Sequence, residues 1–101
     1  MKKRWIITAL TLLSVASAYA QDASSVRQWA ATCASCHGTD GRSVGGIPPS
    51  LAGRPKSELV QTLLDFKSGK RPATIMHQLA KGYSDAQLEA VATYLSAQKP
   101  N

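Results

Sequence analysis

Apolar residues recur at helical spacing along several stretches of the chain, and clusters of glycine and proline separate these stretches. The first stretch has apolar side chains at i, i+3, i+4 and i+7, namely at Val26, Trp29, Ala30 and Cys33. This period predicts a helix that begins near Ala23 and runs into the segment around Cys33. No stretch alternates apolar and polar residues convincingly, so we expect an all-α fold.

Two further helices are predicted after residue 54. Pro55 suits the first turn of a helix that Gly69 ends, and its broad apolar face comprises Leu59, Val60, Leu63, Leu64 and Phe66. A short helix is expected from about Ala73 to Lys81, with its end at Gly82.

The last helix carries the clearest start signal. Ser84 and Gln87 form an S-x-x-Q capping box, and apolar residues then recur with the helical period at Leu88, Val91, Ala92 and Leu95. Pro100 lies beyond its end. The chain is therefore predicted to contain about four helices joined by loops.

The N-terminus has the three-part pattern of an export signal. A basic start leads into a mainly apolar run over 5–15, and the small residues Ala18 and Ala20 follow. We expect cleavage after Ala20, with residues 1–20 as the signal peptide and 21–101 as one small periplasmic domain that is not inserted in a membrane. An uncleaved anchor is the alternative, for which the apolar run is short.

Charge and composition exclude several classes of protein. Hydrophobic residues make up 44% of the chain and charged residues 18%, which is ordinary for a globular domain and not for a disordered one. Removing residues 1–20 takes away three basic residues and no acidic one. The remaining chain has nine basic and six acidic residues, so its formal charge falls from +6 to +3. Because the basic surplus belongs partly to the export signal, we expect no nucleic-acid partner.

The chain has two cysteines, and both lie in the sequence Cys33-Ala34-Ser35-Cys36-His37. In an exported protein, C-x-x-C-H predicts covalent attachment of one haem c. The spacing lets the two thiols add to the two vinyl groups of a porphyrin. The adjacent imidazole of His37 is then held beneath the iron, which it can coordinate.

Three other uses of these cysteines are open. A disulfide between Cys33 and Cys36 would close a very small loop and stabilise little. A thioredoxin-like dithiol requires a βαβ context, and the pattern predicts no strands. A zinc site could recruit both cysteines with His37 and His77, although adjacent Cys36 and His37 suit one tetrahedral ion poorly.

Met76 is the candidate for the sixth iron ligand. It is the only methionine of residues 21–101, and its soft thioether favours Fe(II) more than a second imidazole does. His77 is the rival ligand, and Met76 as a core residue without a ligand role is the third possibility.

The segment from Gly38 to Gly53 is predicted to be a sixteen-residue loop without secondary structure. A loop of this length in a small domain is expected to pack around a bound group, and a flat haem would be such a group. The carbonyl of Pro49 is our candidate acceptor for the second ring nitrogen of His37. A turn-forming proline without that role is the alternative.

The order of these features resembles the class I c-type cytochromes. That family combines an N-terminal helix, C-x-x-C-H-G, a Pro-x-Leu loop, a methionine loop and a C-terminal helix, which are matched here by 33–38, 49–51, Met76 and 84–98. The resemblance implies a class I cytochrome c fold, with about four helices wrapped around one covalent haem and with His37 and Met76 as axial ligands. It also implies single-electron transfer without bond-making chemistry.

Three segments are more specifically similar to the cytochrome subunit of flavocytochrome c, a periplasmic sulfide dehydrogenase: IPPSLAGR (47–54), FKSGKRPATIMH (66–77) and AKGYSD (80–85). Several members of that family are dihaem, whereas this chain has one haem motif. The resemblance implies that electrons come from an FAD-containing partner that oxidises sulfide. A free soluble cytochrome that shuttles electrons between respiratory or photosynthetic complexes is the alternative.

Basic residues flank the methionine segment, at Lys67, Lys70, Arg71 and Lys81. They are candidates for steering an acidic redox partner towards the haem edge. An ordinary solvated surface is the alternative.

Overall fold

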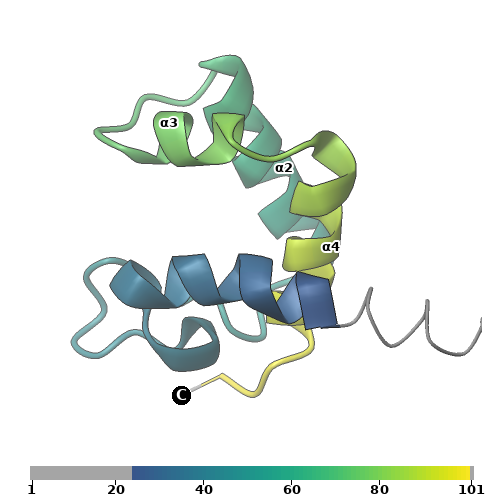
Figure 1. The fold of residues 1–101 in the computed structure, drawn as a ribbon. Helices are drawn as coiled ribbons and strands as arrows, with labels where there is room; N and C mark the ends of the chain where they lie inside the picture. Colours follow the sequence, from purple (N-terminus) through teal and green to yellow (C-terminus); the bar gives the residue numbers. More distant parts are fainter. Residues whose placement is uncertain (1–23, 101) are drawn as a thin grey trace, which may run out of the picture.

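The structure is a computed structural model, which describes residues 24–100. This part of the chain consists of helices and loops without a strand, as the sequence predicts (Figure 1). Its elements are a helix over 24–37, a 3-10 turn η1 (Thr39–Gly41), α2 (Lys56–Ser68), α3 (Met76–Lys81) and α4 (Asp85–Ser96). The proposed signal peptide and the predicted helix start at Ala23 lie outside the described residues.

The second helix matches its prediction to within one residue. Pro55 is its N-cap and stands just before the first turn, because its ψ of 132° is not helical. Gly69 ends α2 with a φ of 81°, a left-handed conformation that favours glycine, and its N–H bonds to the carbonyl of Phe66.

The third helix is shorter than predicted. It begins at Met76 and not near Ala73, because Ile75 has a non-helical φ of −136°. The carbonyl of Ile75 accepts hydrogen bonds from the N–H groups of Gln78 at 2.9 Å and Leu79 at 3.1 Å, so this residue caps the helix. Gly82 follows the end of α3 as expected.

The fourth helix begins with the predicted capping box. The N–H of Gln87 donates to Ser84 Oγ at 3.1 Å, and the N–H of Ser84 donates to Gln87 Oε1 at 2.8 Å. Two of the first-turn donors of α4 are thereby satisfied by local sequence alone.

One buried cluster holds these helices together. It consists of Ala30, Leu59, Val91, Ala92 and Leu95, and Trp29, Cys33, Leu51, Val60, Leu63 and Tyr94 pack against it. In Figure 1 the 24–37 helix and the following loop form one side of the molecule, α2 and α3 form the other, and α4 joins them at one end. None of the helices within residues 24–100 is long and apolar enough to span a membrane.

Candidate haem-binding site

The last turn of the 24–37 helix carries both cysteines. Cys33 and Cys36 are three residues apart and therefore neighbours on the helix surface. Both thiols are free, so the structure contains no disulfide between them. Cys33 is half-buried against the core while Cys36 is exposed, and burial raises the pKa of the Cys33 thiol above its usual 9.0. Cys33 thus stays protonated more readily than an exposed thiol would.

Gly38 turns the chain away from this helix. Its φ of 86° lies in the region that glycine favours, and a β-carbon at this position would collide with the backbone carbonyl of Arg42. The N–H of Gly38 still bonds to the carbonyl of Ala34 at 3.0 Å. The sharp turn sends the chain back along the helix and past His37.

His37 is 9% exposed, and its Nδ1 lies 2.7 Å from the carbonyl oxygen of Pro49. A carbonyl can only accept, so Nδ1 carries the proton and donates it. With this proton on Nδ1, the lone pair of Nε2 is available for a metal ion. This is the contact that the sequence predicts for the Pro49 carbonyl.

The loop that carries Pro49 differs in one respect from the prediction. Residues 38–53 were expected to lack secondary structure, but η1 forms at their start. The turn is closed by hydrogen bonds from Gly41 N to Gly38 O at 2.9 Å and from Arg42 N to Thr39 O at 3.0 Å. A composition rich in glycine predicts that a segment is a loop, but it does not predict where a single 3-10 turn forms within that loop.

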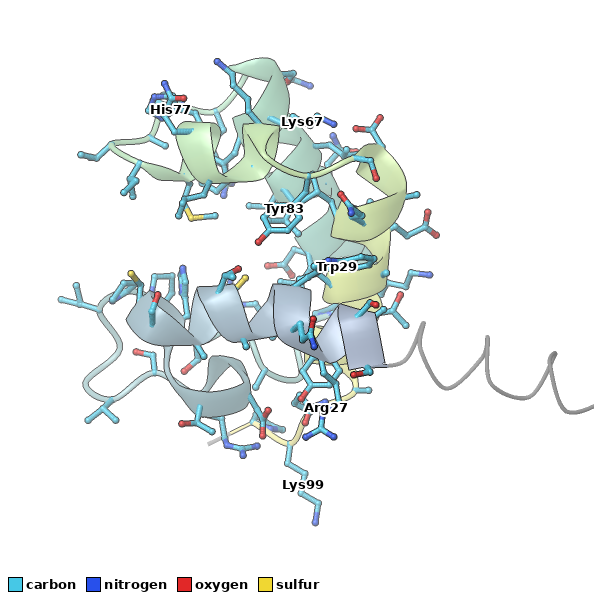
Figure 2. All side chains as sticks on the ribbon, in the orientation of Figure 1. Arg27, Trp29, Lys67, His77, Tyr83 and Lys99 are labelled. Atoms are coloured by element: carbon cyan, nitrogen blue, oxygen red, sulfur yellow. The ribbon has the colours of Figure 1, made fainter. Side chains whose placement is uncertain are left out.

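Met76 and His77 are both half-buried, but they lie on different faces of α3. Met76 and Ala80 are four positions apart and share one face of α3, and Ala80 is 2% exposed, so its end of this face points into the molecule. His77 shares its face with the exposed Lys81. Figure 2 shows His77 on the side of α3 that faces away from the 24–37 helix.

The zinc alternative is not supported. Over residues 24–100, no three His, Cys, Asp or Glu side chains gather in a way that could hold a metal ion. The structure therefore does not bring His77 to Cys33, Cys36 and His37.

The residues present fit a covalently attached haem. The helix end offers two free thiols and one imidazole whose outer nitrogen is already hydrogen-bonded. Large apolar side chains on α3 and its cap are exposed, with Ile75 at 57% and Leu79 at 47%. An apolar macrocycle requires such surface to cover its faces.

One contact near the site has no signal in the sequence. Thr32 Oγ1 and Tyr83 Oη share a hydrogen bond of 2.8 Å that links the 24–37 helix to the connection between α3 and α4. Figure 2 shows Tyr83 and Trp29 between the two sides of the molecule. No local motif could have found the Thr32–Tyr83 contact, because the two residues are 51 positions apart.

The four basic residues near Met76 are not equivalent. Lys67 Nζ pairs with Asp85 Oδ1 at 2.8 Å. Lys70, Arg71 and Lys81 are exposed and have no carboxylate partner among the described residues, although Arg71 lies over the Phe66 ring at 5.6 Å from its centroid. The unneutralised positive charge near α3 therefore comes from these three residues.

Comparison with known proteins gives consistent matches. Residues 20–95 match the family described as cytochrome C oxidase, cbb3-type, subunit III. The cytochrome subunit of sulfide dehydrogenase from Chlorobaculum tepidum is 41% identical over 63 residues, which are 62% of this chain and 56% of that protein. Cytochrome c4 from Pseudomonas aeruginosa is 37% identical over 100 residues, which are 98% of this chain and 50% of that protein.

A solved structure of cytochrome c4 from Acidithiobacillus ferrooxidans is 44% identical in sequence. The two structures superpose with a TM-score of 0.59, and the matched region covers 64% of this chain and 37% of the cytochrome c4 chain. The all-helical fold is thus shared with a class I cytochrome. The chain spans about half the length of the curated relatives that it matches.

Proposed function

The chain belongs to the c-type cytochromes, in the family described as cytochrome C oxidase, cbb3-type, subunit III, and we propose that it carries electrons through a haem ligated by His37 and Met76. It is an electron-transfer protein, and its cofactor is covalent haem c. That group supplies one-electron chemistry, with the iron alternating between Fe(II) and Fe(III).

Each residue of the site has a separate task in this proposal. Cys33 and Cys36 attach the haem through thioether bonds, and His37 donates the lone pair of Nε2. The Pro49 carbonyl holds the proton at Nδ1, which fixes the tautomer and the ring orientation. The observation that carries the proposal is the 2.7 Å contact between His37 Nδ1 and the carbonyl oxygen of Pro49. His37 directly follows the second cysteine, Cys36.

Met76 is the proposed sixth ligand. Its support is that it shares a face of α3 with the buried Ala80, whereas His77 lies on the side of α3 that faces away from the 24–37 helix. A thioether binds Fe(II) relatively better than an imidazole does and so raises the reduction potential, which suits a reversible carrier.

The proposed location is the periplasm, and the proposed electron donor is an FAD-containing subunit that oxidises sulfide. The basic start and apolar run over 5–15 support export, with the domain spanning residues 21–101. The similarity to a protein named as the cytochrome subunit of sulfide dehydrogenase supports the donor. The alternative is a free soluble cytochrome that shuttles electrons between respiratory or photosynthetic complexes.

Expression of the full chain with its signal, in a host that matures c-type cytochromes, tests the proposal. We expect a red protein in the periplasmic fraction, with a Soret band and a redox titration that fits one electron. A colourless periplasmic protein with two reactive thiols would refute it. Gel filtration of native extract then distinguishes the two proposed roles. A flavin that co-elutes with the haem supports the role of an enzyme subunit, and elution without flavin supports the role of a free electron carrier.

A further inference from the structure

The carbonyl of Pro49 is fixed by anchors on the three residues that follow it. The N–H of Ser43 donates to Ser50 Oγ at 2.9 Å, and Ser50 forms the peptide unit that contains the Pro49 carbonyl. Directly after Ser50, the N–H groups of Leu51 and Ala52 donate to the carbonyl of Gly41 at 2.7 and 3.2 Å. These three hydrogen bonds close a loop whose only described contact with His37 is the Pro49 carbonyl.

The rest of the loop gives this carbonyl little support. Val44 is 94% exposed and Ile47 is 90% exposed. Gly45 and Gly46 have positive φ angles, and a β-carbon on either would meet no atom within 4 Å. Packing over 44–47 therefore cannot hold Pro49 in place, and proline has no N–H with which to anchor itself.

We propose that Ser50 is a positioning residue, whose hydroxyl holds the Pro49 carbonyl on His37 and thereby tunes the electron-donor strength of the imidazole. The inference rests on the proposed role of His37 as iron ligand. The hydrogen bond from Ser43 N–H to Ser50 Oγ lies within this loop, and the contact between the loop and His37 is the Pro49 carbonyl, so we assign the effect of Ser50 on His37 to that carbonyl.

The physical link is the hydrogen bond at Nδ1. A short bond to a carbonyl makes the imidazole more electron-rich, which stabilises Fe(III) and lowers the reduction potential. When the loop loses the Ser43–Ser50 bond, the carbonyl samples positions further from Nδ1. The ring then becomes a weaker donor, and the potential rises.

The test uses purified haem-loaded protein with Ser50→Ala, the rescue variant Ser50→Thr, and Ser68→Ala as a control. Ser68 is exposed and donates to the carbonyl of Asp65 at 3.2 Å, so its replacement removes a hydroxyl outside this loop. We expect Ser50→Ala to shift the midpoint potential to more positive values. Deuterium exchange of the His37 Nδ1–H, followed by NMR in the reduced protein, should become about fivefold faster, as expected for one lost hydrogen bond.

The rescue and the control sharpen the result. Ser50→Thr keeps the acceptor oxygen and should restore both values, and Ser68→Ala should change neither. If Ser50→Ala does not accumulate, Ser50→Cys replaces the hydroxyl by a weak acceptor of similar size and should shift both readouts in the same direction by less. A positive shift in Ser50→Cys then supports the proposal, and unchanged values overturn it.

A purely structural role for Ser50 predicts a different pattern. It would lower the denaturant midpoint and leave the potential and the Nδ1–H exchange as in the wild type, which overturns the proposal while the haem site stands. Failure of the proposed function looks different again, because the wild-type protein itself would then lack haem or carry it without His37 on the iron.

Discussion

Tyr94 on α4 donates its hydroxyl proton to Asp40 Oδ1 at 2.8 Å, across 54 positions of sequence. The other carboxylate oxygen of Asp40 lies 3.3 Å from Arg42, which also donates to the carbonyl of Lys99 at 3.0 Å. Asp40 has a φ of 53°, an unusual value for a residue with a side chain. The last helix and the C-terminal segment thus hold the strained turn that follows the haem motif.

Replacing this tyrosine tests the contact. Tyr94→Phe should lower the free energy of unfolding by about 1 kcal/mol at neutral pH, the usual net contribution of such a hydrogen bond. The hydrogen bond to Asp40 raises the pKa of Tyr94 above 10.0, with burial and the charge of Asp40 as smaller causes and Arg27 opposing them. A raised pKa in the folded state means that this stability is complete below pH 10.0 and is lost as the pH rises through the raised value.

Denaturant unfolding of wild type and Tyr94→Phe between pH 7 and 11 measures the difference. The deficit of the variant should shrink above about pH 10, because the wild-type hydroxyl then loses the proton that it donates. Tyr83→Phe is the matched control, since it removes a tyrosine hydroxyl that bonds to Thr32 instead. A deficit that stays constant to pH 11 would show that the Tyr94–Asp40 bond is not its source.

Haem attachment depends on both thiols. Cys33→Ala and Cys36→Ala should each leave the haem on one thioether with reduced yield, and the double variant should have no covalent haem. Haem staining of denaturing gels checks this, with Ser35→Ala as a control that keeps both thiols. Staining of the double variant at wild-type intensity would remove the basis for covalent attachment.

The sequence predicted local features better than contacts between distant residues. The capping box of α4 depends on Ser84 and Gln87 three positions apart, and it formed as expected. The start of α3 was wrong by about three residues, because periodicity says nothing about the backbone angle of Ile75. The Tyr94–Asp40 and Ser43–Ser50 bonds lacked any sequence signal, since they exist only once the loop is folded.

The candidate site divides in the same way. The motif at residues 33–37 was evident from spacing alone. The sequence favours Met76 over its neighbour His77 because His/Met ligation recurs in c-type haem proteins, and the structure adds that the two side chains lie on different faces of α3. The ion pair between Lys67 and Asp85 needed the packed structure, which brings the two side chains together across 18 positions.

The iron ligand is tested by substitutions on α3. Met76→His should keep a low-spin haem and lower the reduction potential, because imidazole stabilises Fe(III) better than a thioether does. His77→Ala should leave the ligation unchanged, since His77 faces away from the 24–37 helix. The weak near-infrared methionine-to-iron band of the oxidised protein is the readout, and its survival in Met76→Ala with loss in His77→Ala would reverse the assignment.

The basic residues near α3 predict how the protein meets its partner. Lys70, Arg71 and Lys81 have no carboxylate partner in the described part of the chain, whereas Lys67 is paired with Asp85. Replacing any one of the three unpaired residues with Gln should therefore slow electron transfer with an acidic redox protein at low salt more than Lys67→Gln does. Stopped-flow rates give the comparison, and equal effects would show that the ion pair does not neutralise Lys67.

Salt dependence distinguishes a diffusing carrier from a bound subunit. A free carrier must find its partner in each cycle, so its rate should fall steeply with salt as screening confines the attraction to about 8 Å at physiological ionic strength. A subunit already bound to a flavoprotein has no encounter to screen, and its internal transfer rate should hardly change. We expect the complex to survive gel filtration at moderate salt with a flat rate profile. Elution of the cytochrome alone, together with a steep salt dependence, would reject the subunit and leave the shuttle.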